Sequence, residues 1–281
     1  MTTRRDRDWN ATASGWKQWQ PISEKAAQTV TEIMLDMAAV SPGDTVIDLA
    51  TGIGDTAAAC ARRVGPTGRV LATDGAKAML TLAERFVEDK GFNNVSYKIA
   101  NLDNLNFGRT KFDAAICRWG LMFAKDLTST LKLIRAHLRP EGCFSAIVWG
   151  PPERAEVQSF ANGILMDFLG LPPVPTGDGT PFALSDKNAL ERNFENAGYS
   201  NVESQTVDVR YKFNTAEEYV RYRRERSSLD KLIAHVTETE RERAWAAVVR
   251  AARKRAGPDN SVRFVSETVV ISGKNAVQQY F

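Results

Sequence analysis

Short apolar runs alternate with amphipathic stretches through the middle of the chain. The apolar runs predict five strands, at residues 45–49, 69–73, 95–99, 112–117 and 143–149. The stretches between them carry apolar residues at helical spacing and predict helices over 55–64, 76–90 and 127–138. Alternation of this kind predicts a mostly parallel, doubly wound α/β sheet with helices on both faces, which binds ligands beyond the carboxyl ends of its strands.

The segments on either side of this core are mainly helical. Upstream, an apolar stripe predicts a helix from Ser23, its expected N-cap, to Ala39. Downstream, the pattern predicts helices at 153–169, 186–197, 215–227 and 238–256 and strands at 202–212 and 262–271. We expect the late strands to complete a seven-stranded sheet. The predicted parts are a helical lid (1–40), a core (41–150), and a helical cap, inserted after the fifth strand, with the last two strands (151–281).

The segment Val46–Asp55 carries the most specific signal in the chain. A buried strand ends at Asp48, and the chain then turns through Gly52 and Gly54 into a helix. Glycine permits positive φ and lets a ligand approach the backbone, while the helix N-terminus presents free N–H groups. The next strand ends at another acid, Asp74. Because neighbouring parallel strands end at the same edge, these residues predict a nucleoside-binding cleft.

Two classes of cofactor fit this turn. The pattern Gly52-x-Gly54-x-x-Ala57, with Asp74 about 20 residues further on, also matches a dinucleotide fingerprint. Asp48 would repel a pyrophosphate at the strand end, but it would attract the ammonium and sulfonium of S-adenosylmethionine (SAM). The spacing therefore favours SAM. An NAD-dependent oxidoreductase is the less favoured alternative, and the chain has no Tyr-x-x-x-Lys pair.

Composition narrows the class of protein without changing this picture. The 37 basic and 34 acidic residues give a net charge of only +3, which does not indicate a nucleic-acid partner. The N-terminus lacks the apolar core of a signal peptide, and no apolar run approaches the ~20 residues that span a bilayer. Three scattered cysteines and two histidines predict no metal site. We expect a cytoplasmic protein with a small-molecule substrate; no pattern here sets its oligomeric state.

Together these motifs resemble the class I SAM-dependent methyltransferases, especially their small-molecule UbiE/COQ5-like branch. The resemblance covers residues 40–150 well and the rest loosely. It implies a Rossmann-like fold, SAM as cofactor and S-adenosyl-L-homocysteine as product. Val46–Asp55 resembles the family's glycine-rich first motif, with Ala50 where the first glycine usually stands.

The resemblance also implies roles for individual residues. Asp48 would face the methionine amino group, Asp74 would hold both ribose hydroxyls, and Met79 would pack on the adenine. The segment 101–107 resembles the adenine-recognition loop, and Arg118 ends the fourth-strand motif beside the methionine tail. The residues implied to bind the cofactor are Asp48, Ala50, Thr51, Gly52, Gly54, Asp74, Gly75, Met79, Asn101, Leu102, Asp103 and Arg118.

Aromatic residues mark the acceptor side of the predicted cleft. In similar enzymes an N-terminal aromatic segment closes over the cofactor, a role that Trp16 and Trp19 would fill here. Trp119 and Phe123 follow the fourth strand and are expected on the same side. The only candidate for a general base is His235 in the presumed cap, and its signal is weak. The catalytic residues are otherwise unassigned.

These features predict methyl transfer to O, C or N of a small, apolar or aromatic metabolite by in-line displacement. Such a reaction needs alignment and exclusion of water more than it needs side-chain chemistry. A SAM-binding protein that uses the cofactor structurally or in another reaction stays open, because its binding motifs would be the same. A nucleic-acid base methyltransferase is disfavoured, because Cys117-Arg118-Trp119-Gly120 stands where such enzymes carry N/D-P-P-Y/F.

Overall fold

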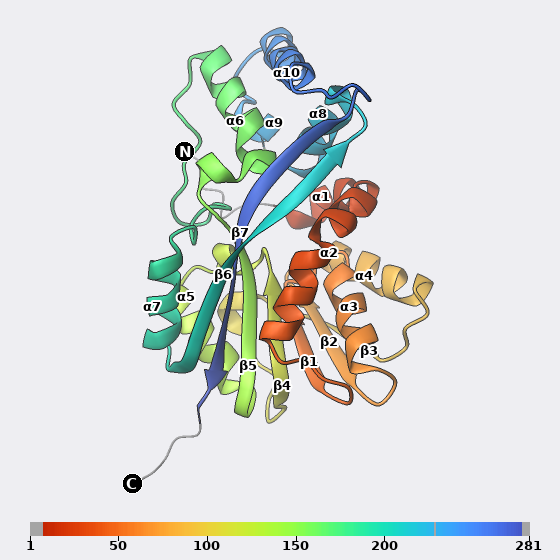
Figure 1. Ribbon diagram of the computed structural model, residues 1–281, viewed down its shortest axis with the longest axis vertical. Helices are drawn as coiled ribbons and strands as arrows, with labels where there is room; N and C mark the ends of the chain where they lie inside the picture. The colour runs from red at the N-terminus through yellow and green to blue at the C-terminus, as the bar shows by residue number, and fades with distance from the viewer. Residues whose placement is uncertain (1–7, 228, 277–281) are drawn as a thin grey trace.

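A computed structural model of the protein describes residues 8–227 and 229–276 (Figure 1). The strands are β1 (Thr45–Leu49), β2 (Arg69–Asp74), β3 (Val95–Ile99), β4 (Phe112–Arg118), β5 (Leu138–Trp149), β6 (Tyr199–Phe213) and β7 (Val262–Asn275). The helices are α1 (Trp9–Gln18), α2 (Gln20–Met37), α3 (Asp55–Val64), α4 (Lys77–Asp89), α5 (Leu127–Ala136), α6 (Glu156–Leu169), α7 (Lys187–Asn196), α8 (Ala216–Arg226), α9 (Leu229–Leu232) and α10 (Glu238–Arg253).

The strands form one seven-stranded sheet in the order β3-β2-β1-β4-β5-β7-β6. The first five strands, β1 to β5, are parallel to one another. The β7 strand runs antiparallel to both β5 and β6. The predicted α/β class, with a doubly wound and mostly parallel sheet of seven strands, is confirmed.

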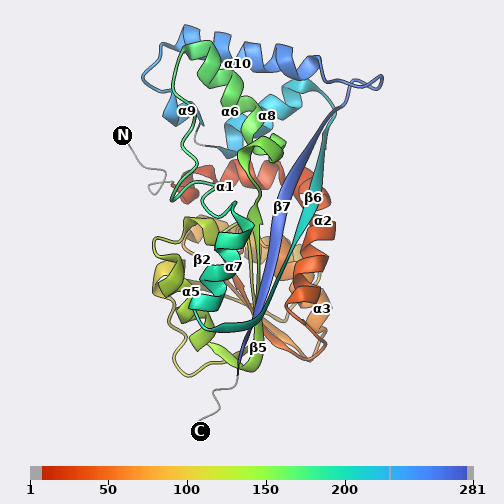
Figure 2. The same ribbon diagram turned by 60° about the vertical axis from the view of Figure 1, so that its left-hand side comes forward.

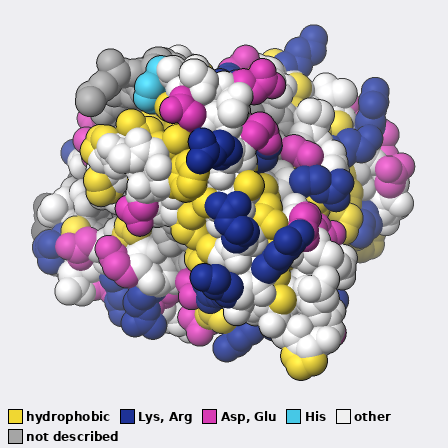
Figure 3. All heavy atoms as spheres, turned by 90° about the horizontal axis from the view of Figure 1, so that it is seen from above, with side chains coloured by type: hydrophobic (Ala, Val, Ile, Leu, Met, Phe, Trp, Pro, Cys, Tyr) yellow, Lys and Arg dark blue, Asp and Glu magenta, His cyan; other side chains and the backbone are white. Residues whose placement is uncertain are grey.

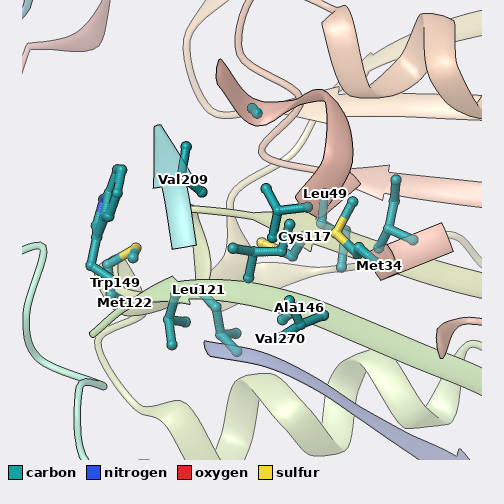
Figure 4. Close-up of a cluster of buried hydrophobic side chains, with 14 of the residues drawn as sticks. Met34, Leu49, Cys117, Leu121, Met122, Ala146, Trp149, Val209 and Val270 are labelled. Carbon is teal, nitrogen blue, oxygen red and sulfur yellow. The ribbon is translucent and has the colours of Figure 1, made fainter. Parts of the chain in front are cut away.

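Helices cover both faces of the sheet and bury its central strands. Figures 1 and 2 show α2, α3 and α4 on one face and α5 and α7 on the other. On α2, Val30, Met34 and Leu35 are fully buried. Figure 4 shows Met34 near Leu49 of β1 and Cys117 of β4. Because both faces are covered, the central strands are nearly continuous apolar runs that the sequence pattern makes easy to find.

The last two strands extend past the sheet and carry a cap at their far ends (Figures 1 and 2). The cap contains α6, α8, α9 and α10. Aromatic side chains join it to the strands: Phe264 stacks on Tyr219 with ring centroids 4.1 Å apart, and Phe213 packs against Tyr222 at 5.0 Å. The α1 helix lies between the cap and the sheet in both views. The division into lid, core and cap stays a prediction, although α2, from the predicted lid, packs on the sheet.

Several element boundaries differ from the predicted ones. The second helix begins at Gln20 with Pro21 in its first turn, and the Ser23 hydroxyl donates to the Trp19 carbonyl, so the N-cap prediction was wrong. The fifth strand begins at Leu138 instead of residue 143, because Leu138 pairs with Phe112 before a register shift. Tertiary pairing thus extends the strand through a stretch that local pattern assigns to a turn.

Charged side chains of both signs mix on the cap surface (Figure 3). Arginines of α8 and α10 pair with acids: Arg224 with Glu242 at 2.7 Å, and Arg253 with Glu217. In the part of the chain that the structure describes, no helix is long and apolar enough to cross a membrane.

Candidate functional site

A cleft of about 350 Å³ opens at the carboxyl ends of β1, β2 and β4, with α1 along one side. This volume lies within the range of small-molecule sites. The residues that line the cleft come from six stretches of the chain, and five of these stretches lie within residues 8–125. The lining residues are Asp8, Trp9, Asn10 and Trp16; Ala50–Ile53, Asp55 and Thr56; Asp74–Ala76 and Met79; Ala100–Asp103; Arg118–Gly120, Phe123 and Lys125; and Gly179.

Most of the residues implied by the family resemblance meet in this cleft. The cleft-lining members of that set are Trp16, Ala50, Thr51, Gly52, Asp74, Gly75, Met79, Asn101, Leu102, Asp103, Arg118, Trp119 and Phe123. Their individual ligand contacts stay predictions. Asp48, Gly54, Trp19 and His235 lie outside the lining.

The two glycines of the turn have different physical reasons to be glycine. Gly52 has φ +60°, and a Cβ added there would meet no atom within 4 Å, so this backbone borders open space in the cleft. Gly54 has φ +91°, and a Cβ there would lie 2.7 Å from the Cα of Ala83. Gly52 therefore leaves room for a ligand, whereas Gly54 allows the start of α3 to pack on α4.

Asp74 joins the ends of two strands at the edge of the cleft. One carboxylate oxygen accepts the Ala76 N–H at 2.9 Å, and the other accepts the Gly52 N–H at 3.0 Å. Burial raises the pKa of this carboxyl, and the backbone hydrogen bonds from Ala76 and Gly52 act in the opposite direction. Because each carboxylate oxygen accepts more than one hydrogen bond, Asp74 can still accept two hydroxyl donors.

Asp48 is fully buried beneath the turn and does not line the cleft. One of its oxygens accepts the hydroxyls of Thr51 and Thr56, each at 2.6 Å. The other has no hydrogen-bond partner among residues 8–227 and 229–276. Burial raises its pKa from 3.8 to about 7, despite these hydroxyl bonds. Thr51 and Thr56 line the cleft and Asp48 does not, and a contact of Asp48 with a methionine amino group stays a prediction.

The acid that does border the cleft at this end is Asp55, which the motif-based reasoning passed over. It is the first residue of α3 and forms an ion pair with Arg118 at the end of β4. The two side chains are only 8% and 10% exposed. Arg118 also donates to the Thr31 hydroxyl of α2 at 2.7 Å. Asp55 is an acid at the first position of the helix that follows the glycine turn, and this position is the sequence signal that identifies it as a candidate.

An aromatic wall forms the neighbouring part of the cleft. Trp119 has φ +55° and stacks on Trp149 with ring centroids 4.5 Å apart. Phe123 meets Trp9 of α1 edge to face at 5.3 Å. The indole N–H groups of Trp119 and Trp16 are buried and have no acceptor among the described residues.

Trp19 and His235, which we also predicted on the acceptor side, do not line the cleft. Trp19 donates to the Glu225 carboxylate at 2.6 Å and packs on Tyr222, so it fastens the start of α2 to α8. His235 lies in an exposed turn between α9 and α10 and does not line the cleft, so this fold gives it no place as a general base. More residues of α1 line the cleft than we predicted, because Trp9 and Asn10 line it beside Trp16.

Ala50 and Gly120, which both line the cleft, pack closely against each other. Ala50 has φ +54°, a conformation that costs alanine roughly 1–2 kcal/mol and explains why glycine is usual here. A Cβ at Gly120 would lie 2.5 Å from the Ala50 Cβ. We expect Gly120→Ala to cost about 2 kcal/mol in unfolding free energy, and Ala50→Gly to recover most of it in the double variant. Urea unfolding of the wild type, the two single variants and the double variant measures this coupling. Additive changes in unfolding free energy would contradict it.

Comparisons with known proteins agree with this architecture. A 2-phytyl-1,4-naphtoquinone methyltransferase of Trichormus variabilis is 32% identical over 135 residues, which are 48% of this chain and 59% of that protein. The ubiquinone/menaquinone biosynthesis C-methyltransferase UbiE of Teredinibacter turnerae is 29% identical over 178 residues, covering 59% and 71%. The chain thus spans less than two thirds of the length of the naphthoquinone relative.

Solved structures with low sequence identity share the fold. The Bacillus subtilis YcgJ protein superposes with a TM-score of 0.57 at 15% identity, over 89% of this chain and 99% of that one. The [4+2]-cyclase SpnF superposes with a TM-score of 0.56 at 14% identity, over 96% and 98%. The model of the ubiE/COQ5 methyltransferase family matches residues 22–164. Because that match spans just over half of the 281 residues, this chain belongs to the ubiE/COQ5 methyltransferase family.

Proposed function

We propose that this chain is a SAM-dependent methyltransferase that acts on a small, apolar or aromatic acceptor. The observation that carries the proposal is the Asp74 carboxylate, which is bonded to the Gly52 N–H at the cleft edge. Met79 and the 101–103 segment line the same cleft. This arrangement offers hydroxyl acceptors for a ribose and an apolar surface for a base. Family membership supports the same assignment.

The residues present fit SAM at both ends of the cleft. At the adenosine end, Asp74 keeps acceptor capacity on both oxygens, and Asn101 uses its carbonyl to accept the Asp103 N–H at 3.1 Å. The amide N–H groups of Asn101 are then left to donate to an adenine. At the other end, Asp55 and Arg118 supply one charge of each sign.

Bound SAM would supply a methyl group on a positively charged sulfur, which is already activated toward displacement. The chain's own contribution is alignment and exclusion of water, through Trp119, Phe123 and Trp16 around the far part of the cleft. No histidine is among the cleft-lining residues that the structure describes. An acceptor whose nucleophilic atom carries a proton would therefore depend on a cleft-lining aspartate or on Lys125 as its base.

The names of the curated relatives suggest the acceptor class. Those proteins are named for 2-phytyl-1,4-naphtoquinone and for ubiquinone and menaquinone biosynthesis. An aromatic acceptor ring would suit the aromatic wall that Trp119 and Phe123 form in the cleft. A SAM-binding protein that promotes a different reaction is the second candidate, since a [4+2]-cyclase has the same fold.

Calorimetric titration with SAM and with NAD tests the cofactor. We expect SAM to bind and NAD not to bind. Asp74→Ala should weaken SAM binding about 10-fold or more, because each hydrogen bond to a charged group contributes about 1.5–3 kcal/mol. The matched control is Asp89→Ala, an exposed acid at the end of α4. Binding of NAD in place of SAM, or wild-type affinity in folded Asp74→Ala, would refute the proposal.

A further inference from the structure

Trp16 lines the cleft, but its own helix does little to fix its ring. The buried residues of α1 are Ala13 and Gly15, which offer almost no side chain to pack on. The ring is held by two neighbours: the Arg226 guanidinium of α8 lies 3.7 Å from its centroid, and Trp9 meets it edge to face at 6.0 Å. One wall of the cleft therefore depends on a residue of the cap.

The Arg226 guanidinium is itself held in one orientation. It belongs to a residue that is only 8% exposed, and it donates hydrogen bonds to the Ser23 hydroxyl of α2 at 2.7 Å and to the Tyr222 hydroxyl of its own helix. It also lies over the Tyr222 ring, 4.7 Å from the centroid. Because a guanidinium is planar, these contacts set the face that it presents to the Trp16 indole.

The end of α8 contacts the α1 segment at further positions beside Trp16. A Cβ at Gly15 would lie 2.2 Å from the Glu225 carbonyl oxygen, so the two backbones touch at this point. The Glu225 carboxylate accepts the Trp19 indole N–H at 2.6 Å. Figures 1 and 2 show α1 between the cap and the sheet. Glu225 and Arg226 thus join the cap to this wall of the cleft.

A small apolar cluster joins α1 to the glycine turn and to the start of α4. Its buried members are Ala13, Ile53, Ala76 and Met79. Trp16 packs against this cluster, which is separate from the main core. A change in the angle of the Trp16 ring would therefore reach Ile53 and Met79, on the side of the cleft where we propose that SAM binds.

A purely structural role is the competing explanation for Arg226. Arg224, two residues earlier on α8, lies over the ring of Trp245 at 5.4 Å and pairs with Glu242. That pair joins α8 to α10, and neither Arg224 nor Trp245 is among the described residues that line the cleft. A buried guanidinium costs free energy that an apolar side chain would not, so packing alone does not require an arginine at position 226.

We propose that Arg226 is a positioning residue for the cleft, which fixes the angle of the Trp16 indole by stacking on it. Arg226 is not among the cleft-lining residues in the part of the chain that the structure describes, so it acts through Trp16. Cation–π contacts are strongest where the cation is desolvated, as this buried guanidinium is. The inference rests on the proposed function, because its expected effect is on ligands of the SAM class.

Calorimetry with S-adenosylhomocysteine measures the effect on the cleft. Arg226→Met should weaken binding about fivefold or more, because the indole is then free to leave the orientation that the ligand needs. Arg226→Lys keeps the charge and lacks the planar fork, so its loss should be smaller. Arg224→Met is the matched control: it removes the equivalent stacking on Trp245 and should leave the affinity within about twofold of the wild type.

A double-mutant cycle separates positioning from general stabilisation of the fold. In the Trp16→Ala background, Arg226→Met should weaken S-adenosylhomocysteine binding no further, because the ring on which Arg226 acts is gone. A structural role predicts an equal loss in both backgrounds, and a loss for Arg224→Met that follows its loss of stability in urea. Either of these two results would overturn the proposal.

Quenching of tryptophan fluorescence by acrylamide reports on the ring itself and needs no ligand. The Trp16 signal is the difference between each protein and its Trp16→Phe counterpart. Arg226→Met should make Trp16 more accessible to the quencher, whereas Arg224→Met should not. Unchanged quenching of Trp16 in folded Arg226→Met would show that the guanidinium does not hold the ring, and would overturn the proposal.

Thermal unfolding checks that each variant is folded. Should Arg226→Met not fold, Arg226→Lys takes its place in every measurement, with the same direction of effect. Failure of the wild type to bind S-adenosylhomocysteine would refute the proposed function, and the quenching result would still decide whether Arg226 fixes Trp16.

Discussion

Gly54→Ala should destabilise the fold by about 3 kcal/mol or more, whereas Gly52→Ala should cost only about 1 kcal/mol and lose cofactor binding. A Cβ at Gly54 would lie 2.7 Å from the Cα and 2.9 Å from the carbonyl oxygen of Ala83, in backbone that cannot swing away. The φ of +91° adds strain for any residue with a Cβ. At Gly52 the added methyl meets no protein atom and would project into the cleft.

The two variants are controls for each other, since both add one methyl at positive φ in the same turn. Urea unfolding gives the stability loss, and calorimetry with SAM gives the binding loss. We expect Gly54→Ala to shift the urea midpoint strongly and Gly52→Ala to shift it little. The reverse order of destabilisation would show that the close approach of α3 to α4 is not what requires glycine.

Asp48→Asn should remove a pH dependence of stability worth about 3 kcal/mol between pH 5 and pH 8. Burial raises the pKa of Asp48 in the fold from 3.8 to about 7. Between these two values the native state therefore binds more protons than the unfolded state, so the contribution of Asp48 to stability falls as pH rises. It is fully present below about pH 4, lost progressively up to about pH 7, and constant above that.

Urea unfolding of wild type and Asp48→Asn at pH 5 and pH 8 measures this effect. Asparagine does not ionise, so the wild type should lose stability relative to the variant as pH rises, by about 1.4 kcal/mol per pH unit up to about pH 7. The asparagine carbonyl can still accept from Thr51 and Thr56, and any fixed cost of its amide is the same at both pH values. Asp89→Asn, an exposed acid, should show no such difference. A pH-independent gap between wild type and Asp48→Asn would contradict the buried, proton-binding carboxyl.

Local pattern predicts the core of this protein well because the signals in it are local. The strand at 45–49 is found with the predicted bounds, since a buried parallel strand is a nearly continuous apolar run. The edge strand at 95–99 also has the predicted bounds, although none of its residues is fully buried. Where pairing decides the extent of a strand, local pattern fails. The fifth strand starts five residues early through its pairing of Leu138 with Phe112. The α9 helix, a single turn within the cap, had no pattern strong enough to predict it.

In the site, too, local sequence predicts some features and only tertiary packing decides the others. Trp16 and Trp19 are three residues apart, and both fit a lid over the cofactor equally well by sequence. In the fold only Trp16 lines the cleft, beneath the Arg226 guanidinium at 3.7 Å, while Trp19 turns to Glu225 of α8. Gly179 reaches the cleft from the segment between α6 and α7, far along the chain from the other lining residues. Which residues meet here depends on how the cap returns over the core.

By itself, the sequence determined the sheet, the glycine turn and the meeting of that turn with Asp74. Strand periodicity and the shared edge of neighbouring parallel strands are enough to place these parts. Only the tertiary structure decided which of two acids borders the cleft. Asp48 and Asp55 bracket the same turn, and Ala50 at φ +54° directs the chain so that Asp48 is buried under two threonines while Asp55 meets Arg118 beside the cleft. The direction of a side chain at a strand end follows from long-range packing, which spacing along the chain does not encode.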